Sequence, residues 1–193
     1  MNLVERVKHI LLTPRPEWEV IDAEPVTTAG LYTGYIMPLA AIGPICQFIG
    51  YSLIGFRLPF GGGVYRTPIG SGVVGAIVGY VLTLVAVYVF ALIIDGLAPT
   101  FGGTKNQIQA LKVAAYSATA GWVAGIFAIV PGLRMLGILG LYSLYLLYLG
   151  LPVLMKSPKE KALGYTVVVI VAGVVLAVIV ATIAGRFVAM PVA

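Results

Sequence analysis

Charged and metal-ligating side chains are scarce in this sequence. Only 10% of its 193 residues are Asp, Glu, Lys or Arg, whereas about a quarter of a typical soluble domain is charged. The single cysteine, Cys46, excludes a disulfide framework and a thiolate metal site. His9 is the only histidine, so no second imidazole is available to bind a metal ion with it. We therefore expect no metal and no cofactor. Because so few residues are polar enough to face water, lipid must surround most of the chain.

Sequence motifs of catalytic sites are also missing. The chain has no phosphate-binding loop, zinc-protease motif or serine elbow. The glycine-rich FGGG at residues 60–63 follows no strand and opens no nucleotide-binding helix, so we expect a flexible outer loop there. The net charge of +5 does not indicate nucleic-acid binding, because the basic residues lie between apolar segments, where they anchor membrane proteins. We expect neither an enzyme nor a nucleic-acid partner.

Apolar residues make up 60% of the chain and gather in long runs. A helix needs about 20 such residues to cross a bilayer. Five runs meet this length, at about residues 31–56, 72–94, 108–130, 135–155 and 163–184. The predicted fold is therefore all-α, a polytopic membrane protein with a bundle of five transmembrane helices. This bundle would occupy residues 30–186, between an N-terminal segment (1–29) and a short outward-facing tail (187–193).

The basic residues divide unequally between the two faces of such a bundle. Eight would lie on the N-terminal face: Arg6, Lys8, Arg15, Lys105, Lys112, Lys156, Lys159 and Lys161. Four would lie on the other face: Arg57, Arg66, Arg134 and Arg186. Because cytoplasmic loops are enriched in basic residues, we predict a cytoplasmic N-terminus and a C-terminus outside the cell.

Two loops carry signals for helix starts on the predicted cytoplasmic face. In KSPKEK, Ser157 is placed to cap a helix, and Glu160 three residues later would complete a capping box. In TKNQIQ, Thr104 and Gln107 repeat the pattern. The tight turn VPGLR, residues 130–134, would make the third and fourth spans an antiparallel hairpin.

Residues 1–29 differ in character from the rest. Leu3, Val7 and Ile10 recur at helical spacing opposite charged residues, which is typical of an amphipathic helix lying in the headgroup plane. Trp18 would then lie at the membrane interface, where indole rings are favoured, and would contact lipid or a partner. An alternative fits the sequence equally well, namely a surface helix docked on the protein's own loops.

Asp95 is the only carboxylate between Pro25 and Glu160. An ionisable residue inside a membrane is a functional candidate. However, at 1.5 Å per residue a helix that starts near Gly70 outruns a hydrocarbon core of about 30 Å before it reaches Asp95. Asp95 would then emerge near the cytoplasmic surface and could meet Lys105 or Lys112. This helix-end interpretation is favoured, and a proton- or ion-handling role remains the alternative.

Tyrosines on the fourth span predict a polar seam inside the bundle. Tyr142 and Tyr145 lie three residues apart, and Tyr142 would lie near mid-membrane, where its hydroxyl needs a partner. Tyr116 on the third span is available at a similar depth. The seam could hold the helices together or form a narrow polar path. Pro38 and Pro44 predict a bend in the first span, and no matching break is expected in another span.

Two stretches resemble the bacterial branch of the Yip1 domain family. They are FGGTKNQIQALKVAAYSATAGWVAGIF (101–127) and LGLYSLYLLYLGLPVLMKSPKEKALGYTVVV (139–169), and ILLTPRPEWEVI (10–21) is similar to the segment before the first span. The resemblance implies five transmembrane helices with a cytoplasmic N-terminus, in a plasma (bacterial inner) membrane. Eukaryotic members associate with Rab-type GTPases and with one another. They use a cytoplasmic region much longer than residues 1–29 here, which argues against GTPase binding by this chain.

Two functional classes follow from these observations. The first is a non-enzymatic membrane protein that contacts the lipid bilayer, other membrane proteins or a second copy of itself. Its candidate contacts include the basic turn formed by Lys156, Lys159 and Lys161, because each basic residue near an anionic leaflet contributes about 1 kcal/mol. The second class is a small transporter or channel that uses the bent first span, the tyrosine seam and Asp95.

Overall fold

The computed structural model describes residues 2–57 and 63–187. Within these ranges, five helical segments are long and apolar enough to cross a membrane: Thr28–Ile54, Ile69–Phe101, Gln107–Ile129, Met135–Leu154 and Lys159–Gly185. The predicted all-α bundle of five transmembrane helices is thereby confirmed. The glycines of the predicted outer loop fall mostly on residues outside the described ranges, as does the predicted tail after Phe187.

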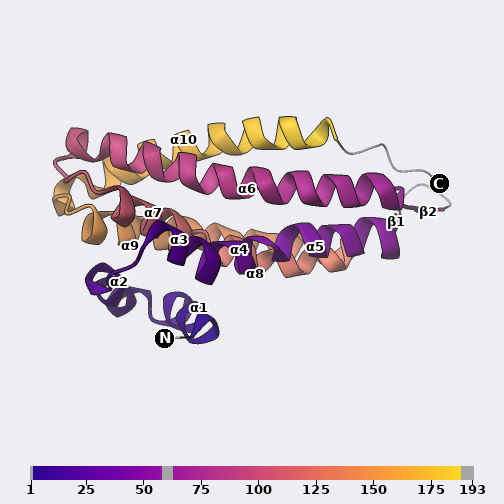
Figure 1. The fold of residues 1–193 in the computed structure, drawn as a ribbon, viewed down its shortest axis with the longest axis horizontal. Helices are drawn as coiled ribbons and strands as arrows, with labels where there is room; N and C mark the ends of the chain where they lie inside the picture. The colour runs from indigo at the N-terminus through magenta and orange to yellow at the C-terminus, as the bar shows by residue number, and fades with distance from the viewer. Residues whose placement is uncertain (1, 58–62, 188–193) are drawn as a thin grey trace.

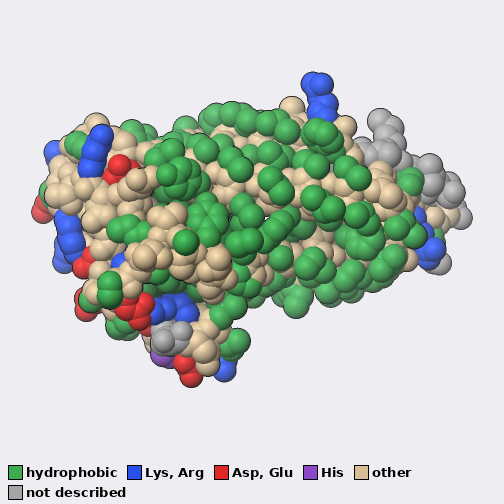
Figure 2. Space-filling model, in the orientation of Figure 1, with side chains coloured by type: hydrophobic (Ala, Val, Ile, Leu, Met, Phe, Trp, Pro, Cys, Tyr) green, Lys and Arg blue, Asp and Glu red, His purple; other side chains and the backbone are tan. Residues whose placement is uncertain are grey.

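The spans run between two chemically different ends (Figure 1). One, which we call the basic end, holds the loops that carry Lys105, Lys156, Lys159 and Lys161. The other, the strand end, holds a short antiparallel pair, β1 (Phe56–Arg57) and β2 (Val64–Tyr65). Figure 2 shows a broad hydrophobic band between them, with charged side chains gathered toward the ends, as expected for a bundle surrounded by lipid.

Helices α6 (Ile69–Leu97) and α10 (Lys159–Gly185) lie side by side along one edge of the bundle (Figure 1). The short helix η3 (Ala98–Phe101) prolongs α6. At the end of α6, the hydroxyl of Tyr165 donates to the carbonyl of Ile94 at 2.5 Å, and its ring stacks on Phe101. These contacts fix α10 against α6 at the basic end, while most of the α10 surface faces outward.

The first span is broken into short pieces, in agreement with its two prolines. It runs through α3 (Thr28–Leu31), a π-helix η1 (Tyr32–Ile36), α4 (Met37–Ala40), α5 (Ile42–Phe48) and a second π-helix η2 (Ile49–Ile54). Proline removes a backbone donor and clashes with the preceding turn, and local π or 3₁₀ adjustments accommodate it within a membrane span.

The third and fourth spans are interrupted as well, so the expectation that only the first span breaks is wrong. The third consists of α7 (Gln107–Ser117), α8 (Thr119–Ala124) and a 3₁₀ helix η4 (Gly125–Ile129). The fourth starts as a 3₁₀ helix, η5 (Pro131–Leu141), and continues as α9 (Tyr142–Leu154). The break between α8 and η4 lies where the first and third spans nearly touch, since a Cβ built on Gly125 would lie 3.1 Å from the Cα of Gly43.

The capping residues predicted for α7 and α10, Thr104 and Ser157, are not the ones found in the structure. The side chain of Asn106, rather than Thr104, caps α7 by accepting from the Gln109 N–H at 3.2 Å. At α10 the cap residue is Pro158, without a side-chain hydrogen bond, and Ser157 is buried with its hydroxyl unpaired. The preceding residue, Lys156, has a positive φ of 55°, which turns the chain so that Ser157 faces inward.

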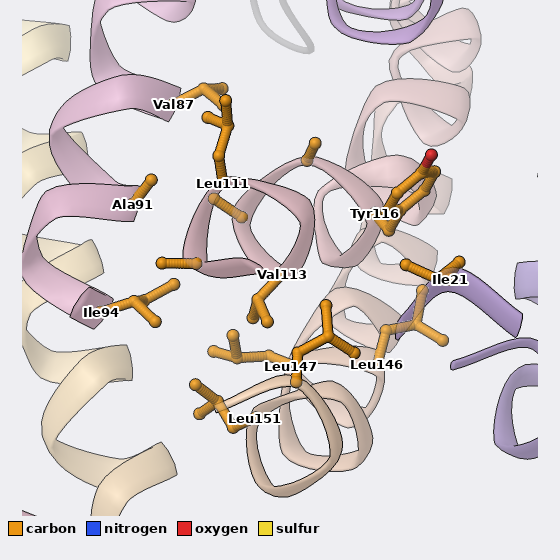
Figure 3. Packing of buried hydrophobic residues seen from close by; sticks show 14 of the residues in the cluster. Ile21, Val87, Ala91, Ile94, Leu111, Val113, Tyr116, Leu146, Leu147 and Leu151 are labelled. Carbon is orange, nitrogen blue, oxygen red and sulfur yellow. The ribbon is translucent and has the colours of Figure 1, made fainter. Parts of the chain in front are cut away.

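The hydrophobic core is centred on α7 at the basic end. Figure 3 shows Leu111 and Val113 of α7 among side chains from three other helices. These neighbours are Val87, Ala91 and Ile94 of α6, Leu146, Leu147 and Leu151 of α9, and Ile21 from the N-terminal segment. The N-terminal segment is therefore part of the core.

Candidate functional site

Two helices precede the first span and lie against the bundle (Figure 1). They are α1 (Leu3–Leu12) and α2 (Pro14–Ala23), which we call the N-terminal helical pair. Asn2 and Glu5 form a capping box at the start of α1, and α2 begins at Pro14, where a missing N–H costs nothing. The pair contacts α8 and α9, so of the two possibilities left open by the sequence, docking on the protein itself is the one observed.

Trp18 is part of this docking contact and does not face lipid, so its prediction as a lipid or partner contact is wrong. Its side chain is fully buried and packs on α9 at Gly150. A Cβ built on Gly150 would lie 2.7–2.8 Å from three atoms of the indole ring. The absence of a side chain at Gly150 therefore creates the space that the ring fills, a pairing that the sequence pattern alone does not reveal.

A buried ion cluster joins the two N-terminal helices. The Arg6 guanidinium donates to Glu17 at 2.5 Å and to Glu24, and both Arg6 and Glu17 are buried. Burial alone would lower the pKa of Arg6, but its hydrogen bond to Glu24 and the charges of the two carboxylates raise it above the ordinary value. Arg6 therefore stays charged, and the cluster holds one cation between two acids.

Tyr116 connects this cluster to the bundle. Arg6 lies 5.7 Å from the centroid of the Tyr116 ring, within range of a cation–π contact. The same ring packs against Tyr35 of the first span, at 4.5 Å between centroids, and edge-on against Trp18. The Tyr35 hydroxyl in turn shares a 2.7 Å hydrogen bond with Thr119. Tyr116 thus holds the N-terminal helical pair and two spans together.

Lys112 binds the C-terminal end of α2. Its ammonium group donates to the carbonyl oxygens of Ile21 and Glu24, at 2.7 and 2.6 Å. These carbonyls belong to the last turn of the helix, which lacks intrahelical donors and carries the negative end of the dipole. Gln109, one turn earlier on α7, donates to the backbone and side chain of Asp22. Lys112 therefore docks α2 and does not pair with Asp95 in the described residues.

Replacing Lys112 with methionine tests this docking role. Lys112→Met keeps the apolar stem but removes both hydrogen bonds, and bonds from a charged donor contribute about 1.5–3 kcal/mol. We expect a loss of that order in the free energy of unfolding, measured in detergent by titration with a denaturing detergent. Lys105→Met is the matched control, because Lys105 is exposed at the same end. Equal losses in the two variants would contradict the role of Lys112.

Tyr142 and Tyr145 do not share a seam with Tyr116. The hydroxyl of Tyr142 donates to the carbonyl of Leu11, at the end of α1, at 3.1 Å. The Tyr145 ring lies 5.4 Å from that of Tyr142 and is exposed. The polar contact between the third and fourth spans is made instead by the N–H of Gly121, which donates to Ser143 at 3.0 Å.

Asp95 lies in the last turn of α6, where the helix-end interpretation placed it. Its carboxylate accepts from the backbone N–H of Asn106 at 2.7 Å and so fixes the loop that leads into α7. Lys105, the residue before Asn106, is exposed and forms no ion pair with Asp95 among the described residues. The contact is structural in kind, because it satisfies a backbone donor just before a helix.

In the basic turn of Lys156, Lys159 and Lys161, one lysine forms an ion pair and the other two do not. Lys156 forms an ion pair with Asp22 of α2 at 2.5 Å. Lys159 and Lys161 are exposed, and their side chains form no hydrogen bond or ion pair in the described part of the chain. Within the same described residues, no three His, Cys, Asp or Glu side chains are grouped to hold a metal ion.

A hollow space lies inside the bundle, away from these residues. One cavity of about 470 Å³ opens between α5, α6 and the third span, and a second of about 540 Å³ continues toward α9. The two share four lining residues, Thr83, Gly121, Trp122 and Val180, and we call them together the interior groove. Asp95, Tyr116, Tyr142 and Tyr145 line neither cavity.

Comparison with known proteins agrees with this architecture. The chain is 31% identical over 168 residues to Inner membrane protein YohC of Escherichia coli strain K12, which covers 84% of this chain and 85% of that protein. The same values hold for Inner membrane protein YohC of Escherichia coli O6:H1. No solved structure matches the chain. The model of the Yip1 domain matches residues 8–181, and the chain therefore belongs to the Yip1 domain family.

Proposed function

We propose that this protein acts without catalysis, by binding anionic lipid headgroups at the basic end of the bundle. The proposal rests on the fact that some charged side chains at this end form contacts within the protein and others do not. Arg6, Glu17, Lys112 and Asp95 are engaged in holding the fold, whereas Lys105, Lys159 and Lys161 are exposed and unpaired in the described residues. The first four side chains hold the fold together, whereas the three exposed lysines suit contact with an anionic surface.

The location and orientation form part of the same proposal. The similarity to Inner membrane protein YohC supports a bacterial inner membrane, and the excess of basic residues at one end supports placing that end in the cytoplasm. Each lysine near an anionic leaflet contributes about 1 kcal/mol, so three of them favour a lipid-bound state strongly enough to measure.

Lipid binding can be tested on the purified protein in neutral detergent. We expect phosphatidylglycerol to raise the melting temperature more than phosphatidylcholine does. The triple variant Lys105→Gln, Lys159→Gln and Lys161→Gln should lose this difference. The matched control carries Arg57→Gln, Arg66→Gln and Arg186→Gln, which remove three charges at the strand end and should keep it. Loss of the difference in both triple variants, or in neither, would contradict the proposal.

The orientation has a separate test by cysteine labelling in intact cells. In a Cys46→Ala background, Lys159→Cys and Arg66→Cys place single thiols on exposed residues at opposite ends. A membrane-impermeant reagent added from outside should label the cysteine at position 66 and spare the one at position 159 until the membrane is opened. Labelling of position 159 in intact cells would reverse the proposed orientation.

A transport role is the second candidate, and the interior groove favours it. Its strand-end part is lined by polar side chains, including Gln47, Thr67 and Thr83. Asp95 does not line the groove, so this candidate no longer depends on it. Proteoliposomes loaded with a pH- or ion-sensitive dye would report flux. Flux that falls in Thr83→Val would support transport, and tight vesicles under every gradient would exclude it.

A further inference from the structure

The interior groove is long and is lined by residues of all five spans. Its lining on α6 extends from Gly72 to Phe90, which at 1.5 Å per residue corresponds to about 27 Å along the helix. Figure 1 shows α6 and α10 on one side of the bundle and α5 and α8 on the other. Small residues leave the space between these sides unfilled, notably Gly75 and Gly79 on α6 and Gly125 on the third span. The result is an elongated, partly open groove within the hydrophobic band.

The chemistry of the lining changes along the groove. Toward the strand end, polar side chains face the hollow, among them Gln47, Ser52 and Thr67. Toward the basic end, the lining is dominated by large apolar side chains: Val87, Phe90, Leu144, Leu147 and Leu176. A groove that is lined by polar side chains at one end and by apolar side chains at the other complements an amphiphile.

Ser52 supplies an independent sign of a missing ligand. Its side chain is 5% exposed and lines the groove, yet its hydroxyl has no hydrogen-bond partner. The hydroxyl lies against α6, where a Cβ on Gly72 would be 2.2 Å from it. A buried hydroxyl without a partner is costly, and a ligand oxygen in the groove would satisfy it.

We propose that the interior groove binds one phospholipid, one of whose two acyl chains lies along α6 and whose ester or phosphate oxygens accept a hydrogen bond from Ser52. The change of lining along the groove favours a lipid over a helix of a second copy, because an amphiphile has a polar and an apolar part of its own, whereas a transmembrane helix is apolar across the whole hydrocarbon core. The site is independent of the headgroup contacts proposed for the basic end.

Trp122 lines both cavities and provides a reporter for the acyl chain. We would reconstitute the full chain in phosphatidylcholine vesicles that contain phosphatidylcholine brominated on its acyl chain, because bromine quenches tryptophan. The neutral lipid separates this test from the binding of anionic headgroups. The second tryptophan, Trp18, is fully buried beside α9 and gives a constant background. Trp122→Phe should abolish the quenchable signal.

Gly79→Leu then distinguishes a groove lipid from lipid at the outer surface. A side chain at Gly79 meets nothing within 4 Å, so leucine fills the groove without a backbone clash. We expect this variant to lose most of the quenching. Gly96→Leu is the matched control, because Gly96 is also open, also on α6 and outside the groove lining, and should quench as the wild type does. Unchanged quenching in Gly79→Leu would overturn the proposal.

Two further variants keep the test decisive if Gly79→Leu folds poorly. Thr83→Leu fills the shared part of the two cavities and should reduce quenching in the same way. Ser52→Ala leaves the groove open but removes the donor, so a larger fraction of brominated lipid should be needed for half of the quenching. An unchanged lipid requirement in Ser52→Ala would disprove the role of the hydroxyl, and normal quenching in Thr83→Leu would disprove occupation of the groove.

Discussion

Arg6→Met should destabilise the protein by about 3–5 kcal/mol, the loss expected when one partner of a buried ion pair is removed. The substitution leaves Glu17 buried and without its guanidinium partner, with the half-exposed imidazole of His9 3.4 Å away. We expect a lower free energy of unfolding in detergent. Amide hydrogen exchange in residues 3–23 should accelerate, because the cluster joins the two helices of this segment.

The double variant separates the cost of an unpaired charge from loss of packing. Arg6→Met combined with Glu17→Met removes both buried charges and replaces them with apolar side chains, a change that is often neutral or stabilising. Most of the stability should therefore return. If the double variant were as unstable as Arg6→Met alone, the ion pair would not be the source of the effect.

Gly150→Ala should release Trp18 from its site on α9. The new methyl group would lie 2.7–2.8 Å from three ring atoms, and expulsion of a buried tryptophan costs up to about 3–5 kcal/mol. Alanine favours a helix by about 1 kcal/mol over glycine, which offsets only part of this loss. In a Trp122→Phe background, the emission of Trp18 should shift to the red as the indole ring becomes wetted.

Gly96→Ala provides the comparison for Gly150→Ala. Gly96 lies within α6, and an added Cβ there meets nothing within 4 Å. It should gain the helix propensity of alanine without any clash, so its stability should equal or exceed that of the wild type. An unshifted Trp18 emission in Gly150→Ala would mean that α9 moves aside to accept the methyl group, against our interpretation.

The five spans could be predicted from the sequence because the lipid environment dictates their composition. A run such as residues 163–184 must be apolar on every side to face hydrocarbon, and this holds whatever its neighbours are. The breaks within the third span could not be predicted in this way. The one at Gly125 lies at a close approach to Gly43, a residue far away in the chain, and this contact exists only in the folded bundle.

The candidate site was accessible to sequence reasoning only in part. The helix-end interpretation of Asp95 needed no more than the length of α6, and the amphipathic pattern of the first helix was visible. The pattern could not say what its apolar face covers, since Trp18 fits an interface as well as a protein core. The partners of Arg6 and Lys112 depend on how α1 and α2 fold back, which leaves no local signal in the sequence.

The docked position of α1 and α2 constrains the order of events during biosynthesis. Their binding surface is built from Lys112, Tyr116, Tyr142 and Gly150, which leave the ribosome after more than half of the chain. The first two dozen residues must therefore wait at the membrane surface, with Trp18 and the charges of Arg6 and Glu17 uncovered, until the third and fourth spans are inserted. A truncation of α1 and α2 would thus remove part of the hydrophobic core.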